Sequence, residues 1–361
     1  MTTSDAGIDV EALDVDPAHW PAQLDTLAPR QVLARWKGVV RSGQRPRLVV
    51  RQAADGEWTG AALVTSRART AGWTIVDVVG EVGPTVAAVI TAARESGQVQ
   101  VRWEGWDLDP ALAVGNGFRP MRSPSVSGNG PSAGYVRWLV PISGPAGASD
   151  AEPEPYRQST HFSCAAVGAL QAMALRDGRS ATNEGPTGEL TREAELRLCR
   201  SATNLPSVEP FGLAVAVRRA WPDVPLEVAL DADQPIMLEH LEGDEVEWRA
   251  ILQRSSRAEA AELGILHRTD RLTSREIRAE IEQGRQVLLL LSLEAWMGVE
   301  VPHWVLCHAV VHGAVVIEDP WVTESVGETW VGSHLLPIAD EDLEMMAGIP
   351  PGGHRGAVVL G

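Results

Sequence analysis

Lysine is almost absent from this chain: Lys37 is the only lysine among 31 basic residues, and 48 acidic residues outnumber them. The net charge is −17 at pH 7. Nucleic acids and anionic membranes are bound by surfaces on which Lys and Arg gather. The composition therefore argues against nucleic-acid and membrane partners. We expect a peptide or amide substrate to be neutral or basic, and the oligomeric state stays open.

Cysteine is also scarce, and its spacing excludes the common metal and redox sites. Cys164, Cys199 and Cys307 cannot all pair with one another, and none belongs to a Cys-x-x-Cys motif. We therefore expect no metal and no cofactor. A reducing cytoplasm is the simplest location for such a protein.

Long apolar runs are missing as well. The most apolar windows, residues 287–293 and 305–317, are too short or too polar to cross a bilayer. The acidic residues 1–16 lack a basic segment followed by an apolar run, so we expect no secretory signal.

A chain of 361 residues with 44% hydrophobic residues is expected to form two domains. The clearest boundary is residues 141–155 (PISGPAGASDAEPEP), where proline, glycine and acidic residues without apolar periodicity predict a linker. We expect a flexible leader at residues 1–20, a mixed α/β domain at 21–140 and a second domain at 156–361.

The first domain combines helical and strand patterns. Helices are expected at residues 22–40, 85–96 and 110–116, and strands at residues 48–52, 60–66, 73–79, 99–103 and 135–140. Its second half resembles the acetyltransferase superfamily, in which a short helix running into Gly-Phe, here residues 117–118, precedes a last strand.

One feature of that superfamily is absent, namely its Gly-rich acyl-CoA loop. The corresponding turn, residues 80–84, reads GEVGP. Pro84 lacks an N–H donor, and Glu81 brings negative charge to the place where a pyrophosphate would bind. The resemblance therefore implies a degenerate acetyltransferase-like domain that packs against its neighbour or presents substrate to it.

The second domain is expected to begin with helices and to continue as a sheet. Helices are predicted at residues 164–175, 191–201, 211–221, 238–264 and 273–283, and strands at residues 226–230, 287–293 and within 303–319. The acidic run at residues 239–247 is interpreted as a solvated face, with guidance of a basic substrate as the alternative.

A candidate nucleophile lies in residues 157–170 (RQSTHFSCAAVGAL), where Cys164 begins an Ala-rich apolar helix. The N-terminus of a helix presents unpaired N–H groups and a partial positive charge, which favour a thiolate and stabilise an oxyanion. Gln158, six residues upstream, can donate a second hydrogen bond to that oxyanion. The alternative is a buried cysteine in a core helix.

A candidate base and its partner flank a later β pattern, residues 302–321 (PHWVLCHAVVHGAVVIEDPW). A two-residue turn at His312-Gly313 would put His303 and Asp319 on opposite faces, because side chains alternate along a strand. An odd connection centred on Val311 would put them directly opposite one another on one face. We predict the odd connection, with the Asp319 carboxylate bonded to the His303 imidazole.

The order Gln, Cys, His, Asp resembles the papain-like cysteine peptidases, and in detail the soluble C39-like peptidases often found beside an acetyltransferase-like domain. The resemblance covers roughly residues 155–345. It implies an α+β fold with a helical part and an antiparallel sheet. It also implies thiol chemistry on an amide, with Gln158 in the oxyanion hole, Cys164 as nucleophile, His303 as base and Asp319 orienting it.

One departure concerns the two residues after the nucleophile, where the family usually has Gly-Pro and this chain has Ala165-Ala166. An alanine in place of glycine narrows the space above the thiol, which would restrict the substrate or mark lost activity.

Several further residues border these motifs. His161, Trp304 and Trp321 are candidate substrate-binding residues, and Trp321 is also expected to shield the Asp319–His303 bond. We interpret Cys199 and Cys307 as core residues. His308 and His312 are expected to face away from His303, which argues against a metal site.

The leading hypothesis is a cysteine peptidase or amidohydrolase that forms a thioester on Cys164. A transpeptidase or transacylase would use the same thioester, and a catalytically inactive binding module is an alternative from another class. An active acetyltransferase in residues 1–145 is a fourth.

Overall fold

The computed structural model describes residues 9–125, 130–143, 152–179, 189–202, 207–350 and 352–361. Its contacts divide the chain into two compact units. Unit 1 comprises Met1–Pro141 and Thr323–Gly332, and unit 2 comprises Ile142–Val322 and Ser333–Gly361. A short segment from late in the sequence therefore belongs to the first unit.

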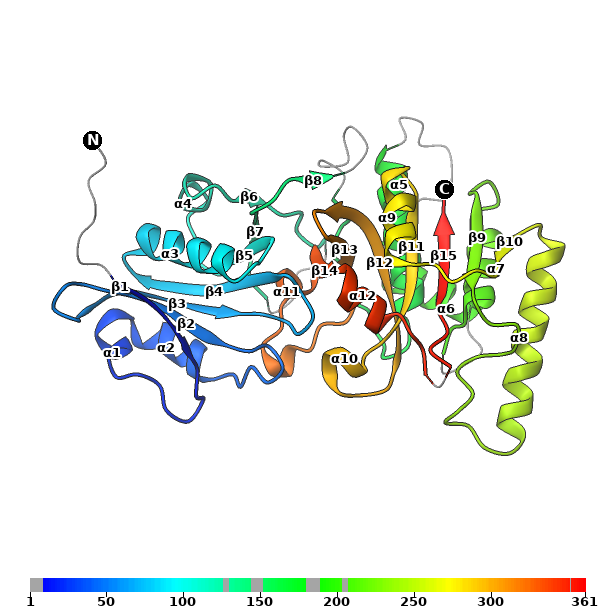
Figure 1. Ribbon diagram of the computed structural model, residues 1–361, viewed down its shortest axis with the longest axis horizontal. Helices are drawn as coiled ribbons and strands as arrows, with labels where there is room; N and C mark the ends of the chain where they lie inside the picture. Colours follow the sequence, from blue (N-terminus) through cyan, green and yellow to red (C-terminus); the bar gives the residue numbers. More distant parts are fainter. Residues whose placement is uncertain (1–8, 126–129, 144–151, 180–188, 203–206, 351) are drawn as a thin grey trace. The chain divides into compact units, whose positions relative to one another are not determined.

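Unit 1 is a seven-stranded sheet with helices on both faces (Figure 1). Its elements are β1 (Asp9–Asp14), α1 (Leu24–Leu27), α2 (Arg30–Lys37), β2 (Arg47–Gln52), β3 (Trp58–Thr65), β4 (Gly72–Gly80), α3 (Val82–Glu95), β5 (Gln100–Gly105), α4 (Pro110–Gly115), β6 (Arg119–Pro120), β7 (Ala133–Trp138) and α11 (Trp330–Ser333), the last of which ends one residue beyond the unit. The strand order is β1-β2-β3-β4-β5-β7-β6. One apolar cluster lies under α3 and the other under α1 and α2.

Two local features of unit 1 bear on the expectations from sequence. Residues 9–14 are not a leader, because β1 pairs antiparallel with β2 along its whole length while Leu13 packs on the apolar cluster beside α2. At the junction of β4 and α3, Glu81 forms an ion pair with Arg51, with 2.6 Å between Oε2 and Nη1. The carboxylate at this junction is thus paired with an arginine of β2.

The late segment Thr323–Gly332 is held inside unit 1 by hydrogen bonds to distant residues. Thr329 donates to Glu104 Oε1 at 2.8 Å, and the indole of Trp330 donates to the carbonyl of Pro131 at 2.9 Å. Burial, opposed by hydrogen bonds from Thr329 and Trp106, raises the pKa of Glu104 to about 7. The first unit is therefore completed by a segment that no sequence pattern assigned to it.

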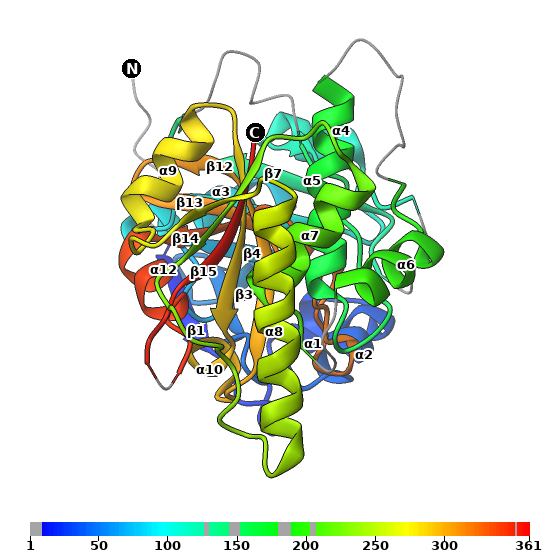
Figure 2. The same cartoon turned by 90° about the vertical axis from the view of Figure 1, so that its right-hand side faces the viewer.

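Unit 2 is a second sheet with helices on both faces. Its elements are β8 (Ile142–Ser143), α5 (Cys164–Arg179), α6 (Arg192–Ala202), α7 (Pro210–Ala220), β9 (Leu226–Leu230), α8 (Asp244–Glu262), β10 (Leu266–Arg268), α9 (Ser274–Glu282), β11 (Gln286–Ser292), α10 (Glu294–Met297), β12 (Pro302–Val311), β13 (Ala314–Glu318), β14 (Leu336–Ala339), α12 (Asp340–Met346) and β15 (Gly356–Leu360), and a 3-10 turn, η1 (Glu324–Val326), lies in the segment given to unit 1. Figure 2 shows α5, α7 and α8 on one side of this sheet and α9 and α12 on the other.

The sheet of unit 2 runs β10-β9-β15-β11-β12-β13-β14, with β8 paired to β12. All of its strand pairs are antiparallel except β9 with β10. The expected α+β class, a helical part packed on an antiparallel sheet, is confirmed. Residues 142–143 lie within the expected linker but form β8 and pair with the end of β12.

The hairpin of β12 and β13 differs from the predicted one. Val311 pairs with Ala314, so the connection is the two-residue turn His312-Gly313, with Gly313 at φ 73°, and the predicted odd connection is wrong. Gly313 supplies the positive φ of this turn, a conformation that glycine adopts at little cost. A bulge between Cys307 and Ala309 then shifts the register by one residue.

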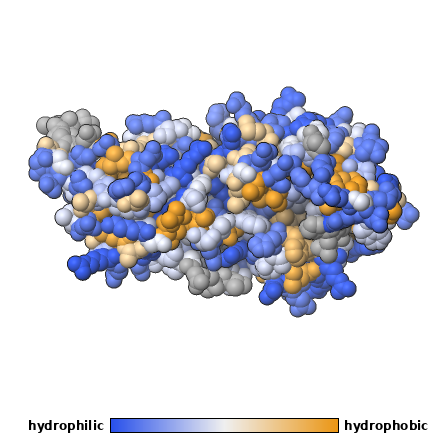
Figure 3. Space-filling model, turned by 90° about the horizontal axis from the view of Figure 1, so that it is seen from below, coloured by the Kyte–Doolittle hydropathy of each residue, from blue (hydrophilic) through white to orange (hydrophobic). Residues whose placement is uncertain are grey.

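On the face of the molecule drawn in Figure 3, hydrophilic side chains predominate and hydrophobic side chains form separate patches. Large exposed hydrophobic side chains include Trp248, Val299 and Val301. Among the helices of the described residues, none combines the length and the apolar character needed to cross a membrane.

Candidate active site

Cys164 is the first residue of α5, as the sequence predicted, and its side chain is 7% exposed. The apolar residues that follow it pack α5 against β11 and β12, while Ser163 at the helix start accepts the backbone N–H of Val167 at 3.0 Å. This helix packing fixes the thiol at a helix N-terminus, where free N–H groups and the helix dipole favour negative charge.

His303 and Asp319 meet directly. The distance from His303 Nε2 to Asp319 Oδ1 is 2.7 Å, and both side chains are buried. Burial lowers the pKa of His303, whereas the charges of Asp319 and Cys164 and hydrogen bonds with both raise it, and the net result is a pKa raised to about 10. The imidazole is therefore charged at neutral pH and lies beside the sulfur of Cys164.

Trp321 covers this pair. Its ring lies edge-on to the His303 ring, with 6.3 Å between the ring centroids, and its backbone N–H donates to Asp319 Oδ1 at 2.9 Å. The ring of His161 lies 5.4 Å from Trp321, and the side chain of His161 is exposed. The structure thus brings His161 and Trp321 together at the edge of the site, and Trp321 lies against the imidazole.

Gln158 is held next to the same loop. Its backbone N–H donates to the carbonyl of Pro320 at 3.0 Å, and its side-chain Nε2 donates to the carbonyl of Thr160 at 2.7 Å. An amide nitrogen carries two hydrogens, so one remains for an oxyanion. The residue is 8% exposed, and burial strengthens such a bond because water is excluded.

Glu195, a fully buried carboxylate on α6, is a residue of this site that was not predicted from the sequence. It accepts the backbone N–H of Ser159 at 2.7 Å, the hydroxyl of Tyr156 at 3.2 Å and the hydroxyl of Ser163. These donors flank Gln158 and Cys164, so one carboxylate holds the loop that carries both. A signal was present: Glu195 lies three and four residues before Leu198 and Cys199, on the buried face of its helix.

Three residues named from sequence lie in the core. Trp304 is 2% exposed, and its indole donates to the carbonyl of Val208 at 2.9 Å, so its expected role in binding substrate is not supported. Cys199 and Cys307 are buried and unpaired by disulfides. Burial, with the charges of Cys164 and Glu195, raises the pKa of Cys199 to about 11. Burial alone raises the pKa of Cys307.

His308 belongs to a separate buried network. Its Nε2 lies 3.0 Å from Glu318, whose other oxygen bonds His334, and His334 Nε2 lies 2.8 Å from Glu152. Burial opposes charge on His334, but Glu318 and Glu152 raise its pKa to about 9. Within the described ranges no three His, Cys, Asp or Glu side chains are placed to hold a metal ion.

Comparison with known families assigns the part of the chain that carries this geometry. A family model described as Peptidase_C39 like family matches residues 154–361, more than half of the chain. This chain belongs to the Peptidase_C39 like family. Among curated proteins, no sequence matches it.

The N-terminal region of this Peptidase_C39 like protein is similar to solved acetyltransferases. A GNAT family acetyltransferase from Staphylococcus aureus Mu50 is 11% identical, with 36% of this chain and 99% of that chain covered and a TM-score of 0.27. A GNAT family N-acetyltransferase from Escherichia coli in complex with CoA is 17% identical, with 38% of this chain and 85% of that chain covered and a TM-score of 0.26. A putative N-acetyltransferase from Lactobacillus plantarum is 12% identical, with 37% of this chain and 99% of that chain covered and a TM-score of 0.29.

The departure at Ala165-Ala166 can be placed in this Peptidase_C39 like protein. Both residues are buried, at 1% and 0% exposure, and both belong to the apolar core of unit 2. Their methyl groups are therefore enclosed by the core and do not line a surface that a substrate reaches.

Proposed function

We propose that this protein is a cysteine peptidase or amidohydrolase that cleaves a peptide or amide bond through a thioester on Cys164. The observation that carries the proposal is the buried hydrogen bond between His303 and Asp319 beside Cys164 at the start of α5. A nucleophile, a base and a group that orients the base are the parts that such a reaction needs.

In the first half of the proposed reaction, the Cys164 thiolate attacks the carbonyl carbon and a C–S bond forms. The carbonyl oxygen becomes an oxyanion, which accepts hydrogen bonds from Gln158 Nε2 and from the N-terminus of α5. The His303 imidazolium then gives its proton to the leaving amine as the C–N bond breaks.

In the second half, the neutral His303 removes a proton from water, whose oxygen attacks the thioester. The C–S bond breaks, the acid leaves, and the proton on His303 restores the ion pair with Cys164. Asp319 accepts the N–H on the far side of the ring throughout, which fixes the orientation of the imidazole and stabilises its charged form.

The test compares the parent protein with Cys164→Ala and His303→Ala on peptide and acyl-amide libraries, read by mass spectrometry. Exchange of the nucleophile or the base should reduce turnover by about three orders of magnitude or more. Equal processing by the parent and both variants would refute the proposal. Addition of a free amine distinguishes hydrolysis, which yields an acid, from acyl transfer, which yields a new amide.

A further inference from the structure

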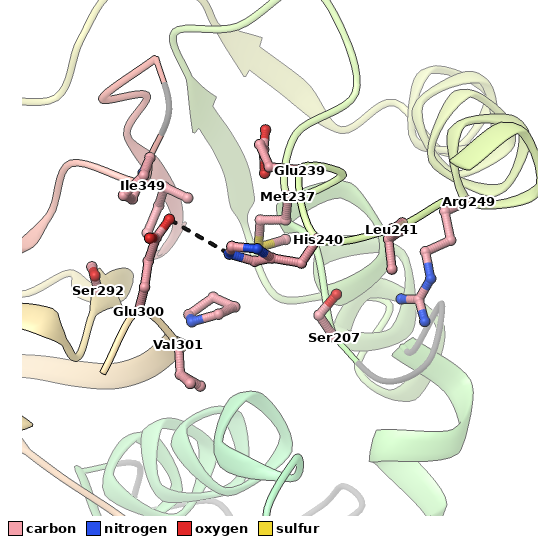
Figure 4. A pocket seen from close by; sticks show the side chains of 12 residues that line it. Ser207, Met237, Glu239, His240, Leu241, Arg249, Ser292, Glu300, Val301 and Ile349 are labelled. Atoms are coloured by element: carbon pink, nitrogen blue, oxygen red, sulfur yellow. Dashed lines mark ion pairs between the residues drawn. The ribbon is translucent and has the colours of Figure 1, made fainter. Parts of the chain in front are cut away.

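A cavity of about 150 Å³ in unit 2 is not used by the proposed reaction. Its lining includes Met237, Glu239, His240, Glu300, Val301 and Ile349. Its lining is mainly apolar, with two carboxylates. In Figure 4 the Glu300 carboxylate and the His240 imidazole point toward one another across the pocket, with the Met237 side chain beside the His240 ring.

The cavity adjoins the catalytic strand. Val301 and Pro302, which line it, directly precede His303 in the chain. On the neighbouring strand Ser292, which also lines it, is paired with Pro302, one position from the pair Leu291 and His303. The wall of this cavity thus includes the residue that directly precedes the base on β12.

A hydrogen bond also fixes the part of the cavity wall at Ser207 to strand β12. Val208 follows the lining residue Ser207 and accepts the indole N–H of Trp304, which itself follows His303. The wall and the base therefore keep a constant spacing, which is what a specificity pocket requires.

The charge of the lining is negative. Arg249 is already paired with Glu245, at 3.1 Å between Nη2 and Oε1. Glu300 has only the exposed His240 at 3.6 Å, a pair that solvent weakens, and Glu239 makes no ion pair within the part of the chain that the structure describes. Two carboxylates thus remain for a cation that enters the cavity.

We propose that this cavity binds an arginine or lysine side chain of the substrate, an inference that rests on the proposed peptidase function. The aliphatic stem packs against Met237, Val301 and Ile349, and the cationic head pairs with Glu300 and Glu239. A side chain that is apolar along its length and charged at its tip matches a lining of this composition.

Size and charge geometry favour arginine over lysine. A cavity of about 150 Å³ can hold a benzene molecule, with about six heavy atoms, and an arginine side chain beyond Cβ has a similar number. Its planar guanidinium donates two parallel hydrogen bonds to a carboxylate, which an ammonium group does not. A cationic substrate also agrees with the net charge of −17.

The test uses alanine-flanked peptides in which one position in turn is arginine, lysine, citrulline, norleucine or glutamate. Binding to Cys164→Ala is measured by calorimetry, so the readout does not depend on turnover. Citrulline has nearly the shape of arginine without the charge, and we expect the arginine peptide to bind at least about tenfold more tightly.

Two variants assign that preference to the cavity. Glu300→Gln and Glu239→Gln, each combined with Cys164→Ala, should bring the ratio of arginine to citrulline affinity toward one. Glu242→Gln is the matched control, because Glu242 is exposed in the same acidic run and does not line the cavity, and it should keep the ratio.

The outcomes separate the two proposals. Equal binding of arginine and citrulline peptides, or tighter binding of norleucine, would overturn the cationic pocket and leave the peptidase proposal intact. Preferred binding of arginine without any turnover that depends on Cys164 would uphold the pocket and refute the peptidase.

Discussion

His303 and Asp319 lie on one face of the β12–β13 hairpin although the turn that joins their strands would, by itself, place them on opposite faces. The bulge between Cys307 and Ala309 supplies the missing one-residue shift, so that Leu306 pairs with Glu318. In this register His303 and Asp319 lie diagonally across the two strands. The bulged residue, His308, bonds to Glu318, so the network next to the site also holds the shift.

The reactivity of the three cysteines should differ. Iodoacetamide at neutral pH should label Cys164 at least about tenfold faster than Cys199, whose raised pKa of about 11 keeps it protonated. His303→Ala should slow the labelling of Cys164 because the adjacent imidazolium is lost. Peptide mapping by mass spectrometry measures both rates.

His312→Ala is the control for that experiment, since His312 is an exposed residue of the hairpin turn. Labelling of Cys164 that is no faster than that of Cys199 would favour an inactive binding module.

The pH profile should show the charged state of His303. Because Asp319 and Cys164 raise its pKa from 6.5 to about 10, the imidazolium that protonates the leaving amine persists to alkaline pH. We expect kcat/KM to fall as pH rises through about 10. Asp319→Asn removes a charge that raises this pKa, so the alkaline limb should move to lower pH.

The same shift affects stability. Because the pKa of His303 is higher in the folded state, its protonation stabilises the fold fully below pH 6.5, and this contribution is lost as pH rises through about 10.

The kcat/KM profile of Asp319→Asn decides the role of this carboxylate. An alkaline limb that stays in place would show that Asp319 does not set the charge of the imidazole.

Glu195 should act on turnover through the loop that it holds. Glu195→Gln removes the negative charge that strengthens the hydrogen bonds from Tyr156, Ser159 and Ser163, and it replaces one acceptor oxygen by a donor. We expect kcat to fall about tenfold to a hundredfold with a smaller change in KM, because oxyanion stabilisation acts in the transition state. Steady-state kinetics measures the two separately.

Glu193→Gln is the matched control, since Glu193 is an exposed residue of the same helix. Glu195→Asp keeps the charge and should recover part of kcat. A rise in KM without loss of kcat would contradict a role in positioning Gln158 and Cys164.

The buried network of Glu318 and His334 should contribute to stability. Glu318→Gln removes one of the two carboxylates that bind the charged His334 and should lower the free energy of unfolding by about 3 kcal/mol. The loss should shrink as pH rises from 6.5 through about 9, because His334 then becomes neutral in the folded protein. Urea denaturation at several pH values measures it.

Glu282→Gln, an exposed exchange on α9, should change stability little at any pH. A loss in Glu318→Gln that does not vary with pH would show that the charge of His334 is not involved.

Local patterns sufficed for much of unit 2. The capping box at Thr273 and Glu276 and the apolar run of β11 are each encoded within a few residues, and the structure has both elements where they were expected. The start of α5 at Cys164 was likewise anticipated from a short motif. The contact of His303 with Asp319 was also predicted, but from an odd connection that the structure does not have.

Features set by distant partners were not predictable in this way. The bulge beside His308 depends on Glu318 and His334, and the role of Glu195 depends on a loop that lies more than thirty residues earlier. Strand β1 was read as a leader because its acidic side chains are those of a solvated segment, although its backbone pairs with β2. Pairing across the chain, rather than local preference, decides such cases.

The placement of Thr323–Gly332 in unit 1 affects the order in which the protein can form during its synthesis. Protein chains emerge from the ribosome with the N-terminus first, and a domain normally folds when its own residues have emerged. The hydrogen bonds of Thr329 and Trp330 to Glu104 and Pro131 cannot form until almost the whole chain has been made. The first unit to be translated is therefore among the last to be finished.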